Sequence, residues 1–461
     1  MQSANILLIH VDQHRFDCVG VNGHPLASTP NLDRLAAEGT NFSHAFCPIA
    51  VCTPARTSLM TGLYATQHGC LVNAGVEGYR PVRRDLPTLS GWLKSTGYWL
   101  GGVGKWSIGV EASPAELGYD AFIPSSAYRT WRRAQGLPPA PRTNTWFGET
   151  DVGVTPAQSA LGWGADHVVR LLQEAARQNR PFFIRWDPEE PHLPSMPPEP
   201  FASLIRPEDV PPWPSFSDTL EGKPAIQRQQ LRSWGIEGWT WRQWAPVVAR
   251  YLGVVAQIDH EVGRILTALD MLGLADQTLV VYTSDHGDLC GAHGMMDKHY
   301  VMYDDVMRVP LIVRWPKWRP DGRRVDALVI SALDLATTFC VAAGVEPPPT
   351  FQGRDLLALA NDSGGPQRER VFGSYHGAQF GAYSQRMVRT RAWKYIWNPT
   401  AEDELYHLAV DPGELRNCAA DAACAESLRT LRNDLVDWMA ETSDPLLNEW
   451  TRRQLLEGKK S

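Results

Sequence analysis

Residues 6–12 read Ile6-Leu7-Leu8-Ile9-His10-Val11-Asp12, an apolar run that ends abruptly at a carboxylate. Two later segments repeat the arrangement: Phe182–Trp186 runs into Asp187, and Leu279–Thr283 runs into Ser284 and Asp285. Short apolar runs of this kind are typical of strands buried within a sheet. We therefore interpret the three segments as strands of one sheet, with polar residues at their carboxyl ends.

Helical patterns lie between these strands. They cover roughly Pro30–Glu38, Leu86–Ser95, Gln158–Arg177 and Val247–Leu272. Strands that alternate with helices predict an α/β fold in which a large mixed, mainly parallel sheet is flanked by helices. Ligands of such sheets bind beyond the carboxyl ends of the strands, where the polar residues are expected to gather.

The length of 461 residues allows a large domain and a smaller one. We expect an α/β domain over residues 1–360 and a small C-terminal α+β domain over 361–461, with the polar stretch Asn361–Arg370 at the boundary. The elements expected beyond it are strands over Val371–Tyr375, Met387–Thr390 and Lys394–Trp397, and a helix near Ala425–Ala440.

Residues 188–244 are rich in Pro and Trp and only weakly periodic. This pattern predicts a long excursion from the sheet, which could serve as a lid. Its tryptophans could line a substrate mouth, or they could pack as a local core or as a subunit contact in a homo-oligomer, which are the commoner roles of Trp. They stand at positions 213, 234, 239, 241 and 244.

The bulk composition excludes several classes of protein. Hydrophobic content is 43%, charged content is 21% and the formal net charge is −7, so a general surface for nucleic acid or anionic membrane is not expected. The N-terminus lacks the basic and long apolar regions of a signal peptide, and no apolar run is long enough to span a bilayer. The eight cysteines show no C-x-x-C spacing. We predict a cytoplasmic protein with reduced thiols.

The segment Cys52-Thr53-Pro54-Ala55-Arg56 carries the most chemical information. Thr53 is a good N-cap and Pro54 suits a first helical turn, so Cys52 is expected just before a helix N-terminus. Free N–H groups and the helix dipole favour negative charge there, and Arg56 can point back to the same place. These five residues alone fit a buried thiol beside an ordinary capped helix equally well.

The pattern C-x-P-x-R over 52–56 resembles the modification signal of the type I sulfatases, in which a maturation enzyme converts the cysteine to formylglycine. Further matches follow in the family's order over nearly the whole chain. They are Thr61-Gly62, Gln67-His68-Gly69, Gly104-Lys105-Trp106, Pro191-His192, Ser284-Asp285-His286-Gly287, Gly291-Ala292-His293-Gly294, Lys298, Arg308-Val309-Pro310-Leu311, Glu404-Leu405-Tyr406 and Asp411-Pro412-Gly413-Glu414. The resemblance implies the fold of the alkaline phosphatase superfamily.

The resemblance also implies one divalent metal ion. Its expected ligands are Asp12, Asp285 and His286, with position 52 facing the ion and Gln13 offering a carbonyl oxygen. Many sulfatases have a second aspartate where this chain has Gln13, and an asparagine where it has His286. All-oxygen sites favour calcium, whereas one imidazole favours manganese or a similar ion, so both Ca²⁺ and Mn²⁺ remain open.

The resemblance implies roles for the surrounding residues. The aldehyde at position 52 would hydrate to a geminal diol, and the metal and Arg56 would stabilise one hydroxyl as an oxyanion that attacks sulfur or phosphorus. Lys105, His192 and Lys298 match cationic residues that bind sulfate, and His192 or Lys298 could protonate the leaving oxygen.

Two positions are expected to bind the substrate and bear on its identity. Asn73 matches a hydrogen-bond donor of related phosphonate hydrolases. Ser107 stands where many sulfatases place a histidine that helps the second hydroxyl to collapse the hemiacetal, so that assistance is in question.

Three functions are therefore compared. The first is hydrolysis of a sulfate monoester of a small soluble substrate. The second is a phosphonate monoester hydrolase or phosphodiesterase of the same superfamily, since Gln13, His286 and Ser107 resemble that branch. The third is an inactive binding protein that keeps the fold, against which the presence of every main motif argues.

Overall fold

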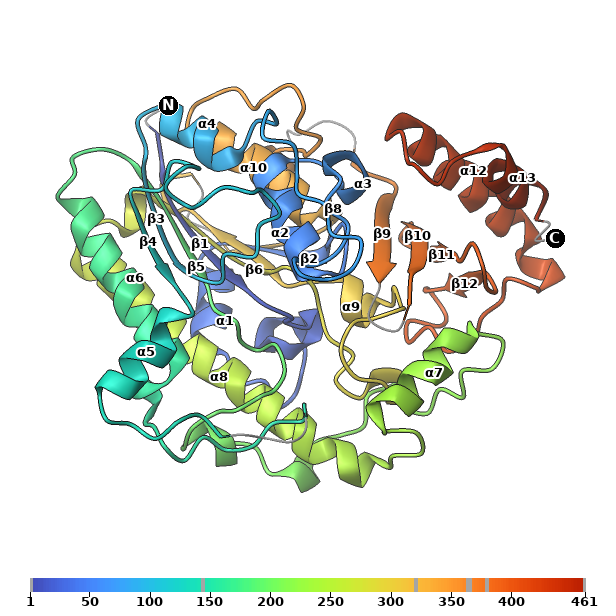
Figure 1. Cartoon of the computed structure of the whole chain (residues 1–461), viewed down its shortest axis with the longest axis horizontal. Coiled ribbons are helices and arrows are strands. Elements are labelled where there is room, and N and C mark those ends of the chain that lie inside the picture. Colours follow the sequence, from blue (N-terminus) through green and yellow to red (C-terminus); the bar gives the residue numbers. More distant parts are fainter. Residues whose placement is uncertain (1–2, 142–145, 319–321, 362–366, 378–380, 459–461) are drawn as a thin grey trace.

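A computed structural model describes residues 3–141, 146–318, 322–361, 367–377 and 381–458. Within these residues, eight strands form one sheet in the order β4-β3-β5-β1-β6-β7-β2-β8 (Figure 1). The strands are β1 (Asn5–Val11), β2 (Thr40–Phe46), β3 (Trp99–Gly104), β4 (Ala121–Pro124), β5 (Phe182–Asp187), β6 (Thr278–Ser284), β7 (Leu311–Arg314) and β8 (Arg323–Ile330). β7 is antiparallel to both of its neighbours and the other pairs are parallel, so the predicted mixed, mainly parallel sheet is confirmed.

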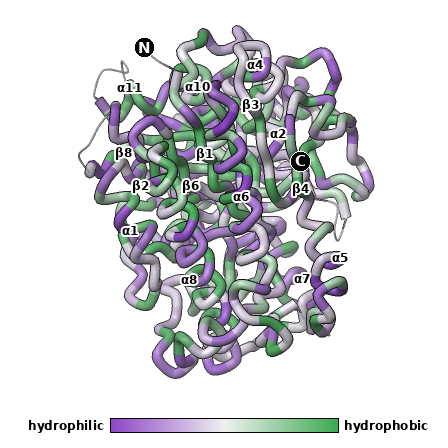
Figure 2. The backbone as a smooth tube through the Cα atoms, turned by 90° about the vertical axis from the view of Figure 1, so that its left-hand side faces the viewer, coloured by the Kyte–Doolittle hydropathy of each residue, from purple (hydrophilic) through white to green (hydrophobic). Residues whose placement is uncertain are grey.

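The apolar run of β1 is explained by burial on both faces of the sheet. Ile6 and Leu8 belong to one hydrophobic cluster, Leu7 and Ile9 belong to another, and all four side chains are buried. Helices α2 (Cys52–Thr61), α4 (Leu89–Ser95) and α10 (Ser331–Ala342) pack in the first cluster. Helices α1 (Pro30–Ala37), α6 (Ala160–Ala176) and α8 (Trp241–Met271) cover the second face. Figure 2 shows hydrophobic segments along the strands, whereas α5 (Ala127–Ala134) at the periphery is mostly hydrophilic.

The four predicted helices are present as α1, α4, α6 and α8, with one boundary clearly displaced. Helix α8 begins at Trp241, six residues before the predicted start at Val247. The backbone N–H of Thr240 donates to Gln243 Oε1 at 2.9 Å, which forms a capping box. Pro246 lies inside the helix but close to its N-terminus, and its missing N–H removes a single intrahelical hydrogen bond.

A second sheet follows at the C-terminal end. Strands β9 (Val371–Gly377), β10 (Tyr383–Arg389), β11 (Trp393–Trp397) and β12 (Glu404–His407) are antiparallel in the order β12-β11-β10-β9. Helices α12 (Ala425–Glu441) and α13 (Glu449–Glu457) complete this part (Figure 1). The predicted C-terminal strands and helix are confirmed, whereas β12 and α13 were not predicted. The proposed boundary at 361–370 falls partly on residues 362–366, outside the described residues, and stays a prediction.

The excursion 188–244 is largely irregular and contains α7 (Ala225–Trp234). Leu193, Ile236, Trp244, Val247 and Met296 form a small buried cluster. Trp234, Trp239 and Trp241 pack against this cluster, and Trp213 donates its indole N–H to the Cys290 carbonyl. Trp234, Trp239, Trp241 and Trp244 thus pack in a local core, one of the roles considered above, whereas Trp213 belongs to the first hydrophobic cluster. No helix among the described residues is long and apolar enough to cross a membrane.

The remaining helices are short. They are α3 (Ala65–His68), α9 (Asp304–Met307) and α11 (Leu356–Ala360). The eight cysteines are all unpaired and seven of them are buried.

Candidate functional site

Four strand ends bring charged residues to one edge of the large sheet. Asp12 follows β1, Lys105 follows β3, Asp187 ends β5 and Asp285 follows β6. The order β3-β5-β1-β6 makes these strands neighbours, so their carboxyl ends lie next to one another. Cys52, at the N-terminus of α2, contacts this edge: its Sγ lies 3.6 Å from Asp12 Oδ1.

Helix α2 starts two residues earlier than predicted. Val51 is the extended N-cap residue and Cys52 is the first helical residue. Thr53 is therefore not the cap, because its hydroxyl contacts Ser107 Oγ at 2.7 Å and its backbone N–H donates to Asn73 Oδ1 at 2.9 Å. All ten residues of α2 are buried, so the Cys52 thiol faces the carboxylates from inside the folded chain.

A metal ion would find four suitable ligand atoms at this edge. Asp12, Cys52, Asp285 and His286 each offer one ligand atom, all four atoms lie within 4.8 Å of one another, and all four residues are buried. The ring of His286 is fixed because Nδ1 donates to the Gly287 carbonyl at 2.9 Å, which leaves Nε2 3.3 Å from Cys52 Sγ. Two carboxylates and an imidazole oriented by a backbone carbonyl are a donor set that fits a divalent cation.

Arg56 is held deep inside the site by three carboxylates. Its Nε donates to Asp285 at 3.0 Å, its Nη2 to Asp12 at 3.2 Å and its Nη1 to Asp187 at 2.6 Å. All four side chains are fully buried. Although burial alone would raise the pKa of Asp187, the Arg185 guanidinium, His10 and Arg56 hold it below its usual range. The guanidinium of Arg56 therefore fixes the positions of the acids that surround the metal-ligand group.

Three further cationic or titratable side chains surround Cys52. Lys105 Nζ lies 2.6 Å from Asp12 Oδ2. Lys298 Nζ lies 3.5 Å from Cys52 Sγ and 3.1 Å from His192 Nε2. Burial and Asp12 would raise the pKa of the Cys52 thiol, but Lys105, Lys298 and His286 hold it well below its usual range. The surroundings of position 52 therefore stabilise negative charge.

The side-chain amide of Gln13 is occupied by other partners. Its Oε1 accepts from Lys298 Nζ at 2.9 Å, and its Nε2 donates to Asp288 and to Asp297, the latter at 3.0 Å. The backbone of Gln13 has a φ of 65°. The structure thus places Gln13 between Lys298 and two acids, beside the four-residue group. Asn73 and Ser107 both contact Thr53, Asn73 through its side-chain oxygen and Ser107 through its hydroxyl.

Several residues of the site were not selected from the sequence. Asp187 was noted only as the end of an apolar run, although its carboxylate contacts Arg56, His10 and Arg185. Asp288 and Asp297 hold Gln13, and Asp297 lies 3.6 Å from Lys298. A strand-end position was the available signal for Asp187, and the position next to Lys298 was the signal for Asp297.

Comparisons with known proteins find relatives that match nearly the whole chain. A family model described as Sulfatase matches residues 4–345, and one described as N-sulphoglucosamine sulphohydrolase, C-terminal, matches residues 291–441. The chain is 29% identical over 473 residues to the Uncharacterized sulfatase YidJ of Escherichia coli (strain K12), covering 98% of this chain and 90% of that protein. It is 26% identical over 470 residues to an Arylsulfatase of Clostridium perfringens (strain 13 / Type A), covering 94% and 93%.

A solved structure shows the same fold. The Phosphonate Monoester Hydrolase of Agrobacterium radiobacter superposes with a TM-score of 0.80 at 26% identity, covering 95% of this chain and 96% of that one. The Sulfatase model matches well over half of the residues, from β1 through α10. The chain belongs to the sulfatase family.

Proposed function

We propose that the chain hydrolyses a sulfate monoester of a small soluble substrate, with a formylglycine made from Cys52 and one divalent metal ion. The ion, Ca²⁺ or Mn²⁺, would be held by Asp12, Asp285, His286 and residue 52. The observation that carries this proposal is the buried group of four ligand atoms within 4.8 Å of one another. A small anionic ester is the substrate class that fits the lysines next to this group.

Each neighbouring residue has a role that follows from its contacts. A bound divalent cation would supply positive charge that stabilises negative charge at position 52. Lys105 and Lys298 neutralise the oxygens of the group being transferred, since their ammonium groups lie next to Asp12 and Cys52. Arg56 acts by orienting Asp12 and Asp285, because all of its nitrogens are engaged by carboxylates.

His192 is the group that we assign to the leaving oxygen. Its Nδ1 donates to the Leu193 carbonyl at 2.7 Å, which fixes the ring and presents Nε2 to the site. Lys298 Nζ lies 3.1 Å from that Nε2 and can supply the proton that His192 delivers. Gln13 keeps Lys298 in this position through its side-chain oxygen.

The modification is tested by peptide mass spectrometry of the chain made together with a formylglycine-generating maturation enzyme. We expect an aldehyde or its hydrate at position 52, and no turnover by Cys52→Ala. Cys424→Ser is the matched control because Cys424 is partly exposed and outside the site, so it should keep full activity. Active enzyme that carries only an unmodified thiol at position 52 would refute the proposal.

A second candidate is a phosphonate monoester hydrolase or phosphodiesterase. It is favoured by Ser107, whose hydroxyl contacts Thr53 where many sulfatases have a histidine, and by the superposed Agrobacterium radiobacter enzyme. A site built from cations around a tetrahedral centre does not sharply distinguish sulfur from phosphorus. The ratio of kcat/KM values for a sulfate monoester and a phosphonate monoester with one leaving group decides between them. A ratio strongly in favour of the phosphonate would make the second candidate the function.

A further inference from the structure

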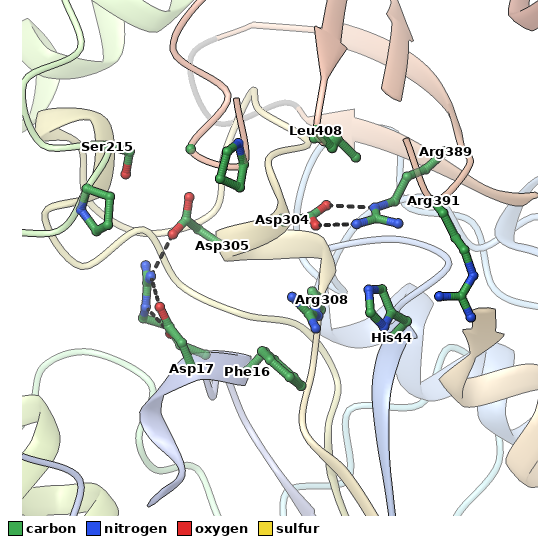
Figure 3. Close-up of a pocket in the computed structure, with 14 residues that line it drawn as sticks. Phe16, Asp17, His44, Ser215, Asp304, Asp305, Arg308, Arg389, Arg391 and Leu408 are labelled. Carbon is green, nitrogen blue, oxygen red and sulfur yellow. Dashed lines mark hydrogen bonds and ion pairs between the residues drawn. The ribbon is translucent and has the colours of Figure 1, made fainter. Parts of the chain in front are cut away.

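A cavity of about 330 Å³ lies between segments of both sheets. Its walls come from the residues after β1, from β2, from α9 and from the C-terminal part of the chain (Figure 3). None of the residues assigned above to the metal or to catalysis lines this cavity. It is therefore separate from the site at the edge of the large sheet.

Charges on one side of this cavity are balanced. Arg15 forms ion pairs with Asp17 at 2.7 Å and with Asp305 at 2.6 Å. His293 lies 3.4 Å from the other oxygen of Asp305. Figure 3 shows Asp17 and Asp305 together on this side, and it shows Arg308, His44, Arg389 and Arg391 on the opposite side.

Arg308 is a largely buried cation on that opposite side without a partner anion. Its Nε and Nη2 both donate to the Ser43 carbonyl, and its guanidinium lies over the Phe16 ring, 3.6 Å from the centroid. Among the described residues, no carboxylate pairs with it and its Nη1 has no hydrogen-bond partner. Burial, together with the neighbouring Arg389, lowers the pKa of Arg308 to about 10, although the Asp304 and Asp17 carboxylates act in the opposite direction.

Arg391 is the second cation at the cavity that forms no ion pair with a described residue. It is exposed at the cavity, and its Nη2 donates to the Asp326 carbonyl without an ion pair to any described carboxylate. Arg389 differs because its Nε and Nη2 donate to Asp304, at 3.1 and 2.8 Å. Burial, together with Arg308 and Arg389, lowers the pKa of His44 to about 4, so His44 is neutral near pH 7 and adds no charge.

We propose that this cavity is a second anion site, in which Arg308 and Arg391 bind the oxygens of a sulfate or phosphate group. Guanidinium groups bind such oxyanions through paired N–H donors. The volume exceeds that of a bare ion and reaches the lower range of pockets for small organic ligands. Phe16, Leu408 and Pro412 supply apolar surface that the organic part of such a ligand could contact. The bound group is thus a free oxyanion or the charged end of a small organic molecule.

Calorimetric titration with inorganic phosphate tests the site in the metal-loaded, mature chain. We expect Arg391→Gln to weaken one binding event at least about tenfold, the loss expected for a charged hydrogen-bond pair. Phosphate inhibition of ester hydrolysis reports the catalytic site and should stay unchanged, as should kcat/KM. Arg416→Gln is the matched control, because Arg416 is exposed, pairs with Asp421 and does not line the cavity.

Further titrations separate the two sources of the anion. Binding of glucose 6-phosphate that depends on Arg391 and is tighter than that of phosphate would assign the site to an organic anion, and equal affinity would assign it to the free ion. A selenate soak of crystals should place the anion between Arg308 and Arg391. The proposal is overturned if phosphate binds Arg391→Gln and the wild type equally, or if uncharged glucose binds as well as glucose 6-phosphate.

Discussion

Arg56 offers the most direct test of how the site is held together, through the substitution Arg56→Lys. The guanidinium forms ion pairs with Asp12, Asp187 and Asp285, and none of these side chains is exposed. A lysine ammonium keeps the charge but cannot reach three carboxylates in a planar fork. At least one buried carboxylate then loses its partner, which costs about 3–5 kcal/mol of folding free energy.

The measurement is urea-induced unfolding followed by tryptophan fluorescence, with the free energy of unfolding obtained by linear extrapolation. Arg264→Lys is the matched control, because Arg264 also pairs with two acids, Asp166 and Glu261, but is partly exposed. Its loss should stay below about 1 kcal/mol. Activity of Arg56→Lys should fall by about 10²-fold through displaced acids. If activity is lost while stability and metal content stay at wild-type values, Arg56 acts on the substrate itself and the orienting role is wrong.

Three further predictions concern metal and charge. Asp285→Asn should lose bound metal and turnover together, whereas the exposed control Asp276→Asn should keep both, as measured by elemental analysis and ester hydrolysis. Chelation should lower both activity and thermal stability, and Mn²⁺ or Ca²⁺ should restore them; recovery of activity without any added metal would contradict the assignment. Burial, with Glu189, raises the pKa of Glu190 from 4.5 to about 7. Between pH 4.5 and about 7 the folded chain therefore binds more protons than the unfolded chain, and the free energy of unfolding should fall as the pH rises through this range. Glu190→Gln should remove that fall, so that above about pH 8 its free energy of unfolding exceeds that of the wild type by about 3 kcal/mol. Glu208→Gln, at an exposed position, should leave the pH profile of the wild type unchanged.

The sequence predicted the strands and the strand-end acids because both depend on local pattern. An apolar run that stops at Asp12 or Asp285 needs no knowledge of distant residues, and the order of the strands then brings the two acids together. The N-terminus of α2 could be located only to within two residues. The hydroxyl of Thr53 has a partner in Ser107, far along the chain, and therefore does not cap the helix.

Partners that come from distant segments could not be read from the sequence. Gln13 matched a ligand position, yet its amide is bound by Lys298, Asp288 and Asp297, all contributed by the loop after β6. Asp187 became important only because His10 and Arg56 reach it from β1 and α2. The excursion could be recognised by its composition, but the packing of Trp244 with Leu193 and Met296 depends on tertiary contacts.

The burial of α2 has a consequence for the time at which Cys52 can be modified. Every residue of the helix is buried, and the segments that cover it come later in the chain: the loop after β6 contacts Arg56, α10 packs on the helix, and Ser374 of β9 pairs with Ile49 just before it. At typical rates of synthesis, β6 follows Cys52 by on the order of ten to fifty seconds. An enzyme that acts on this cysteine must bind the nascent or unfolded chain, because folding closes the thiol off. Under the proposed conversion of Cys52 to formylglycine, the modified fraction of a preparation would be fixed during synthesis, and incubating the folded protein with a maturation enzyme would not raise it.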